Sequence, residues 1–483
     1  TDFGRILVQG GTLTLDGPAS VHGELLIEEA PETLEGEGLV TIETDGFMRV
    51  ENSNVDSDID NNGIVSATDF VQFRGAFSNQ NGAQFIIDGA DGSTGMADVI
   101  FDIGFTNDGT IELTDSSPAS NDVFLTIDTG TLVNSTTGVI KATDPVDTGD
   151  TTVLRQITAQ VTHDGLIEAV DDNTALTIVN TGTFDARNGT FDEGLGLISS
   201  VQDGDVLLGT GTTFLSNSPN FYSIRNDQTV QLDSDLMIPP GTHIGFAGFG
   251  GHTHTIIGPG QLIVEGVAQF GGNTFVDTPV DAREYIIFTQ TNNVINSTFL
   301  TSVDTRIQVG SIGGTNPGDV SFASDFTNHG LIDLRTAAGS NSRSLTVNGI
   351  LTNAADGRIE TNNTGTIVPA IIAEVINEGQ ITPDDADLLI DGIFTQSSTG
   401  VLNIAIDSAS DFDQLTVTDT FTPGGTLNVT YNDPMPMDGQ TFDIVPYDTF
   451  GGGDFDTTNG LDIGAAFELV AGPDTNAYQI EVN

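Results

Sequence analysis

The sequence predicts an all-β protein built from stacked repeats, and three observations lead to this prediction. A short pattern of alternating apolar residues followed by a turn recurs along the chain. The 58 glycines supply many turns, while 17 prolines are too few for a disordered linker and 37% hydrophobic residues suffice for a core. No stretch shows sustained helical spacing with capping residues. We therefore expect very little helix.

The repeat is clearest in three segments that share the same internal spacing. They are LTIDTGTLVNSTTGVIKA from Leu125, LTVNGILTNAADGRIE from Leu345 and LLIDGIFTQSSTGVLNI from Leu388. Shorter versions of the second half surround four further glycines, namely Gly109, Gly165, Gly330 and Gly379. The repeat glycines form two groups, one at residues 109, 138 and 165 and the other at 330, 357, 379 and 400. Within each group, successive glycines lie 21 to 29 residues apart, a spacing typical of one coil of a solenoid.

The alternation within each repeat predicts which side chains point inward. Ile111 and Leu113 lie on one face of a strand, and the Glu between them lies on the other. Asn134 and Gly138 mark the corners, where a sharp turn favours left-handed backbone angles. Coils stacked on interior aliphatic ladders predict a right-handed parallel β-helix, or β-solenoid, followed by a β-rich capping segment.

These repeats resemble the passenger regions of bacterial autotransporters and related surface β-helix proteins, over most of Gly10 to Ile406. The stretch that starts DFDQLTVTDTFTPGG at Asp411 resembles the segment that closes large secreted bacterial repeat proteins. The resemblance implies a repeat array over residues 1–406 and a capping or assembly segment over 407–483. It also implies an extracellular or cell-surface protein with a structural or adhesive, non-enzymatic role. The expected partners are further copies of the chain or components of the cell surface or extracellular matrix.

The charge balance excludes whole classes of partner. The chain carries 12 Lys and Arg against 69 Asp and Glu, which gives a net charge of -57. Nucleic acids and anionic membranes are therefore repelled, and screening salt or divalent cations are expected in the native medium. No apolar run is long enough to predict a transmembrane helix. The absence of cysteine excludes disulfides and cysteine-ligated zinc.

One segment, DIDNNGIVSATDF from Asp58 to Phe70, has the pattern of a calcium loop. Side-chain oxygens that match the spacing of an EF-hand-type loop come from Asp58, Asp60, Asn62 and Asp69. A second interpretation needs no ion, because the same segment aligns with the repeat around Gly109, with Val65 at the position that Ile111 has in that repeat. We favour the interpretation as one coil of the solenoid, and calcium remains the one candidate cofactor.

Three histidines, His243, His252 and His254, could together hold zinc. A polar ladder on the outer face of adjacent strands explains them equally simply, and we favour that interpretation because no fourth ligand is indicated.

A carbohydrate-active β-helix, either a polysaccharide lyase or hydrolase or a tailspike-like depolymerase, is the alternative function. Its candidate carboxylates are the pairs Asp171 with Asp172 and Asp384 with Asp385. In so acidic a chain, we interpret such pairs as solvated corners. A cluster of Arg and Asp on one face of neighbouring coils would favour the enzyme.

Overall fold

The computed structural model describes the whole chain except residues 1, 29–31, 90–95, 118–120, 145–153, 172–173, 193–196, 202–203, 216–220, 226, 248–251, 311–317, 337–342, 364–366, 385–386, 433–438, 462–468 and 483. The described residues form 53 strands and no helix, so the all-β prediction is confirmed. Within the same residues, no helix is long and apolar enough to cross a membrane. The chain divides into two compact units, Thr1–Gly245 with Ile257–Gly260, and Phe246–Ile256 with Gln261–Asn483.

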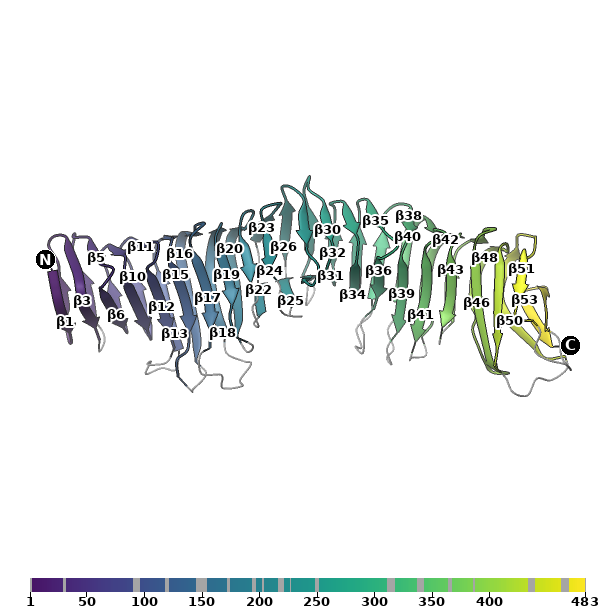
Figure 1. The fold of residues 1–483 in the computed structure, drawn as a ribbon, viewed down its shortest axis with the longest axis horizontal. Coiled ribbons are helices and arrows are strands. Elements are labelled where there is room, and N and C mark those ends of the chain that lie inside the picture. The colour runs from purple at the N-terminus through teal and green to yellow at the C-terminus, as the bar shows by residue number, and fades with distance from the viewer. Residues whose placement is uncertain are drawn as a thin grey trace. The chain divides into compact units, whose positions relative to one another are not determined.

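Three short strands make one coil of the first unit. In one coil they are β7 (Ser53–Val55), β8 (Ile59–Asn61) and β9 (Ile64–Thr68). The next coil contains β10 (Phe70–Phe73), β11 (Phe77–Asn79) and β12 (Gln84–Asp88), and the one after it contains β13 (Met96–Phe101), β14 (Thr106–Asn107) and β15 (Thr110–Thr114). Each strand pairs in parallel with its counterparts in the neighbouring coils. Figure 1 shows counterpart strands of successive coils, such as β12 and β15, side by side, an arrangement like that of a solenoid.

The pairing register aligns the inward side chains into ladders, as the sequence predicts. Val65 pairs with Phe85, which pairs with Ile111, and all three side chains are fully buried. The ladder continues through Ile140 in β17 (Val139–Thr143) and Ile167 in β19 (Leu166–Ala169). Each such side chain contributes roughly 1.5–3 kcal/mol of burial free energy. The core of this unit is therefore a set of continuous apolar columns.

A second interior column is polar and runs through the ends of the middle strands. The Nδ2 group of Asn61 donates to Oδ1 of Asn79, that of Asn79 to Asn107, and that of Asn107 to Asn134, each at 2.7 Å. Each amide also donates to a backbone carbonyl of the following strand, for example Asn61 to Gln84 at 2.9 Å. The second unit repeats the arrangement with Asn328, Asn353, Asn377 and Gln396.

This column corrects the role that the sequence assigns to the corner asparagines. The described residues with a positive φ do not include Gly138, and they include neither Asn134 nor Asn353. Their buried amides instead satisfy one another and the backbone, because a buried polar group must be hydrogen-bonded.

The second unit has a matching stack of parallel strands. The stack contains β34 (Tyr285–Ile295), β36 (Arg306–Val309), β39 (Leu331–Thr336), β41 (Arg358–Asn363), β43 (Gln380–Asp384) and β46 (Val401–Ser408). Its interior ladder is aliphatic and fully buried, and consists of Ile286, Ile307, Ile332, Ile359, Ile381 and Leu402. The side chains between these positions point outward, so each coil presents a row of polar groups on this face.

Antiparallel pairing appears close to the C-terminus. β48 (Leu415–Thr422) pairs in parallel with β50 (Thr441–Phe450), and β46 pairs in parallel with β49 (Thr426–Tyr431). β50 and β52 (Leu469–Pro473) then pair antiparallel with β53 (Ala477–Val482). The predicted division at residue 406 falls inside β46, and parallel pairs lie on both sides of it.

Candidate functional site

Asp58 and Asp60, the first two candidate calcium ligands, hold neighbouring coils together. Asp58 precedes β8 and is exposed, and its Oδ1 accepts a hydrogen bond from the backbone N–H of Ala76 at 2.8 Å. Asp60 points outward from β8 and accepts from Ser78 Oγ at 2.8 Å and Gln80 Nε2 at 2.6 Å. Both carboxylates are thus engaged by the following coil.

Asn62 precedes β9 and Asp69 follows it, so the two residues lie at opposite ends of the strand. The backbone N–H of Asn62 donates to Ile42 O at 2.7 Å. Asp69 is buried with a φ of 58°, and its carbonyl accepts from Asp98 N at 2.8 Å. The segment from 68 to 77 contains strand rather than the helix that follows a calcium loop. The favoured coil interpretation therefore describes the backbone of this segment.

No cluster of metal-binding side chains is found in the part of the chain that the structure describes, counting groups of at least three His, Cys, Asp or Glu. His254, in β29 (His254–Ile257), is fully buried and its ring lies 5.9 Å from that of Phe246. The prediction that His254 belongs to an outer polar ladder is wrong. Inward residues alternate with outward ones, and His254 occupies an inward position paired with buried Thr274. His252 lies outside the strands, and His243 begins β28 (His243–Ala247).

The candidate catalytic carboxylate pairs are only partly described. Asp171 accepts a hydrogen bond from the backbone N–H of Asp144 at 2.7 Å, which is a structural role. Asp172 and Asp385 lie outside the described residues, and the backbone of Asp384 ends β43.

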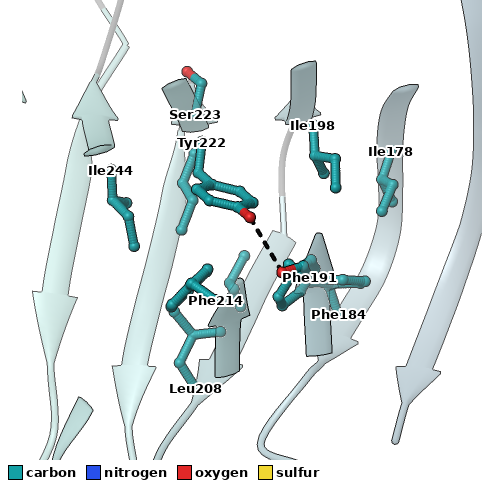
Figure 2. A pocket seen from close by; sticks show the side chains of 11 residues that line it. Ile178, Phe184, Phe191, Ile198, Leu208, Phe214, Tyr222, Ser223 and Ile244 are labelled. Carbon is teal, nitrogen blue, oxygen red and sulfur yellow. Dashed lines mark hydrogen bonds between the residues drawn. The ribbon is translucent and has the colours of Figure 1, made fainter. Parts of the chain in front are cut away.

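An apolar cavity inside the first unit is too small to be a ligand site. Its volume is about 40 Å³, whereas ligand pockets usually enclose about 300–1,000 Å³. Figure 2 shows the aromatic side chains around it, and Tyr222 Oη donates to Phe191 O at 3.1 Å and Leu215 O at 2.9 Å. Ser223, the other polar residue of the lining, accepts a hydrogen bond from Arg225 Nε at 2.5 Å. Because both polar lining residues are already bonded, this space is a packing void.

The strongest candidate site is an arginine cluster on the outward face of the second unit. We define it by five side chains from adjacent strands: Tyr285, Arg306, Gln308, Asp333 and Arg335. Parallel pairing sets Arg306 beside Tyr285 and Gln308 beside Asp333. The alternation that buries Ile307, Ile332 and Leu334 turns these polar residues outward, so their proximity follows from the register.

Asp333 lies at the centre of the arginine cluster. Its Oδ2 accepts a hydrogen bond from Nη2 of Arg306 and another from Nε of Arg335, the latter at 2.6 Å. The Asp333 side chain is only 4% exposed, while Arg306 and Arg335 are 36% and 25% exposed. A nearly buried carboxylate therefore holds two partly exposed guanidinium groups through charge-assisted hydrogen bonds.

Tyr285 and Gln308 complete the arginine cluster. The Arg306 guanidinium carbon lies 5.3 Å from the centre of the Tyr285 ring, a cation–π distance. The Tyr285 hydroxyl donates to Gln308 Oε1, and Gln308 Nε2 donates to Gly310 O at 2.7 Å. The ring and the guanidinium thus hold one another in place.

Electrostatics keep Tyr285 and Arg306 protonated. Burial raises the pKa of the Tyr285 phenol, and this effect outweighs the nearby positive charges of Arg306 and Arg335. Burial disfavours the charged form of Arg306, but the hydrogen bond and charge of Asp333 prevail and raise its pKa. A general base needs a pKa near the working pH, so these shifts suit binding better than proton transfer.

Sequence reasoning missed this cluster, although a signal exists. Arg306, Arg335 and Arg358 fall within about fifty residues and account for a quarter of the basic residues. Their outward positions follow from the repeat, but their mutual distances depend on loops of unequal length.

Comparisons with known proteins do not place the chain in a family. No family model matches the chain, and no curated protein resembles it closely enough to count as a relative.

Proposed function

We propose that this chain is an extracellular, non-enzymatic protein of a bacterial surface with a structural or adhesive role. In this proposal it is a right-handed parallel β-helix closed by a C-terminal capping segment. The observation that carries the proposal is the parallel stacking of short strands on continuous interior ladders. Such stacking produces a stiff scaffold with long outward faces.

The C-terminal strands support the capping part of the proposal. An exposed strand edge would pair with other chains, and antiparallel β53 adds to β50 where a further parallel coil could otherwise stack. Tyr478, Phe442 and Ile480 are buried there, and the Tyr478 ring lies 6.3 Å from that of Phe421 in β48, so these strands continue the apolar core of the parallel coils.

The acidic surface supports assembly through cations. With a net charge of -57, copies of the chain repel one another unless salt or divalent ions intervene. We therefore propose that copies associate into a filament or lattice when calcium bridges their outward carboxylates.

Negative-stain electron microscopy of the purified chain tests this proposal. Filaments or sheets are expected with millimolar calcium, and separate particles are expected after chelation. Separate particles under both conditions, at protein concentrations well above the micromolar range, would contradict the assembly.

A carbohydrate-active enzyme is the second candidate, and the arginine cluster is the observation that favours it. Arg and Asp side chains there meet on one face of neighbouring coils. The raised pKa of Tyr285 argues against a catalytic base. Incubation with neutral and uronic polysaccharides, followed by assays for reducing ends and unsaturated products, decides between the two. Turnover that is abolished by Arg335→Ala would replace the non-enzymatic proposal.

A further inference from the structure

We propose that the arginine cluster on β34, β36 and β39 is a binding site for a carboxylate-bearing saccharide, that is, a glycan that contains uronic acid. The inference rests on the adhesive role proposed above and deepens it by naming the class of partner. Four features of the described residues carry it.

The first feature is the supply of unused hydrogen-bond donors. Arg306 reaches Asp333 through Nη2 alone, and Arg335 reaches it through Nε alone. Among the described residues, the Nη1 groups of both arginines and Nη2 of Arg335 have no hydrogen-bond partner. Both side chains are partly exposed, so these donors are open to a ligand. Guanidinium groups bind carboxylates in a planar, bidentate manner.

The second feature is the number of arginines that contact each carboxylate. Elsewhere on the chain, two arginines are each bound by two carboxylates. Arg187 lies between Asp185 and Asp233, with N–O distances of 2.7 and 2.6 Å. Arg283 likewise reaches both Asp281 and Glu265 at 2.7 Å.

In the arginine cluster the ratio is reversed, because two arginines share one carboxylate oxygen of Asp333. Glu360, which pairs with Asp333 in register, lies near Arg306 and is bound by Arg358 at 3.4 Å. With that pair included, three arginines face two carboxylates, so this face keeps a local excess of positive charge on a chain whose net charge is -57. Long-range repulsion of an anionic ligand is screened beyond about 8 Å at physiological salt, whereas direct contacts with the two arginines are not.

The third feature is an aromatic side chain beside the positive charges. The chain has five tyrosines and no tryptophan. Tyr222, Tyr447 and Tyr478 are buried. Tyr285 and Tyr431 are partly exposed, and Tyr285 lies on the strand next to Arg306. An aromatic ring with a polar tip offers an apolar surface that sugar rings can cover.

The fourth feature favours a saccharide over an acidic peptide. Extended peptides commonly bind by adding a strand to a free sheet edge. β36 is already paired with β34 and β39, and β39 is paired with β36 and β41. The backbone of this face therefore has no edge to offer, and recognition must come from side chains.

Isothermal titration calorimetry of the full chain at 0.15 M salt tests the site. The probes are a homogeneous oligouronate, the same oligomer with its carboxyl groups reduced to alcohols, poly-glutamate and sodium acetate. Saturable binding is expected for the oligouronate alone. Equal binding of the reduced oligomer, poly-glutamate or acetate would overturn the assignment, as would no binding of the oligouronate.

Three variants locate the site on the chain. The double variant Arg306→Gln, Arg335→Gln should weaken oligouronate binding at least about tenfold, whereas Arg283→Gln, the matched control in the same unit, should leave it unchanged.

Asp333→Asn removes the competing carboxylate, so it should preserve or strengthen binding while circular dichroism confirms the fold. Such an increase cannot come from unfolding. Equal losses in the double variant and the control, or a tenfold loss in a folded Asp333→Asn variant, would contradict the proposal.

The titration does not depend on whether copies of the chain assemble. Binding without filaments would leave the saccharide site intact and remove the assembly part of the proposed function. Filaments without oligouronate binding would support the assembly and remove the saccharide site.

Discussion

Asn134 Nδ2 donates a hydrogen bond to His163 Nδ1 at 3.1 Å, at the end of the asparagine column of the first unit. Because Nδ1 accepts, the proton of the neutral ring lies on Nε2, which donates to Thr190 O at 3.0 Å. His163 is fully buried and its ring lies 5.1 Å from that of Phe191. A second ring proton would point at the amide N–H groups of Asn134, so the fold accommodates only the neutral imidazole.

This arrangement predicts a loss of stability in acid. Burial lowers the pKa of His163 to about 4, and the hydrogen bond to Thr190 offsets only part of that effect. The unfolded chain takes up the proton near pH 6.5. The contribution of His163 is therefore complete above pH 6.5 and is lost as the pH falls to about 4, a change of about 3 kcal/mol.

Urea unfolding at several pH values between 7.5 and 4 measures this change. Carboxylates also titrate in this range, so the comparison is with His163→Asn, which keeps an amide in the column and has no ring to protonate. The wild type should lose more stability on acidification than the variant does. Parallel pH profiles would show that His163 does not control this slope.

Interior ladder positions should not tolerate charge. Leu351 lies in β40 (Arg343–Asn353), is fully buried, and pairs with Phe326 and Val375 in the neighbouring coils. Leu351→Asp should unfold adjacent coils, because the carboxylate has no partner or solvent there. Thr352→Asp, on the outward side of the same strand, is the control and should change stability by less than about 1 kcal/mol. Thermal melts followed by circular dichroism compare the two, and similar melting temperatures would contradict the assigned faces.

Stability should also respond to cations. With 69 acidic and 12 basic residues, the folded chain concentrates like charges that added salt screens. The melting temperature should rise with sodium chloride, and rise further with millimolar calcium if ions bind the folded state. Magnesium at equal ionic strength separates screening from site binding. Melting that is indifferent to all three salts would remove the support for a cation-rich native medium.

The sequence predicts the interior of this protein better than its polar groups. Ile111 and Leu113 are both buried as expected, because alternation with period two assigns a face without knowledge of the partner strand. The prediction for the corner asparagines is wrong because an asparagine at this position of the repeat can be either a turn residue or a buried amide in a column. The sequence pattern is the same in both cases.

The arginine cluster depends on information that local patterns lack. Arg306 and Asp333 are 27 residues apart and meet only because β36 and β39 pair in one register. A shift of that register by one residue would turn Asp333 inward. The loops between coils differ in length, so the sequence alone does not fix which outward residues become neighbours.

The last prediction decides whether residues 58–85 act as a coil or as a calcium loop. Phe77 is 6% exposed and its ring packs 5.1 Å from that of Phe85, so Phe77→Ala should cost about 3–5 kcal/mol as a core truncation. Asp58 is exposed and accepts one backbone hydrogen bond, so Asp58→Ala should cost less than about 1 kcal/mol.

A calcium loop predicts the reverse order of these two costs in the presence of the ion. In that case Asp58, Asp60, Asn62 and Asp69 would supply the side-chain oxygens, although β9 separates the first three from Asp69 in the structure. Calorimetric titration with calcium compares the wild type with the Asp58→Ala, Asp60→Ala double variant. Because both carboxylates already bond to the following coil, we expect no micromolar site and equal heats. A single micromolar site that disappears in the double variant would show that the loop binds calcium and that these hydrogen bonds yield to the ion.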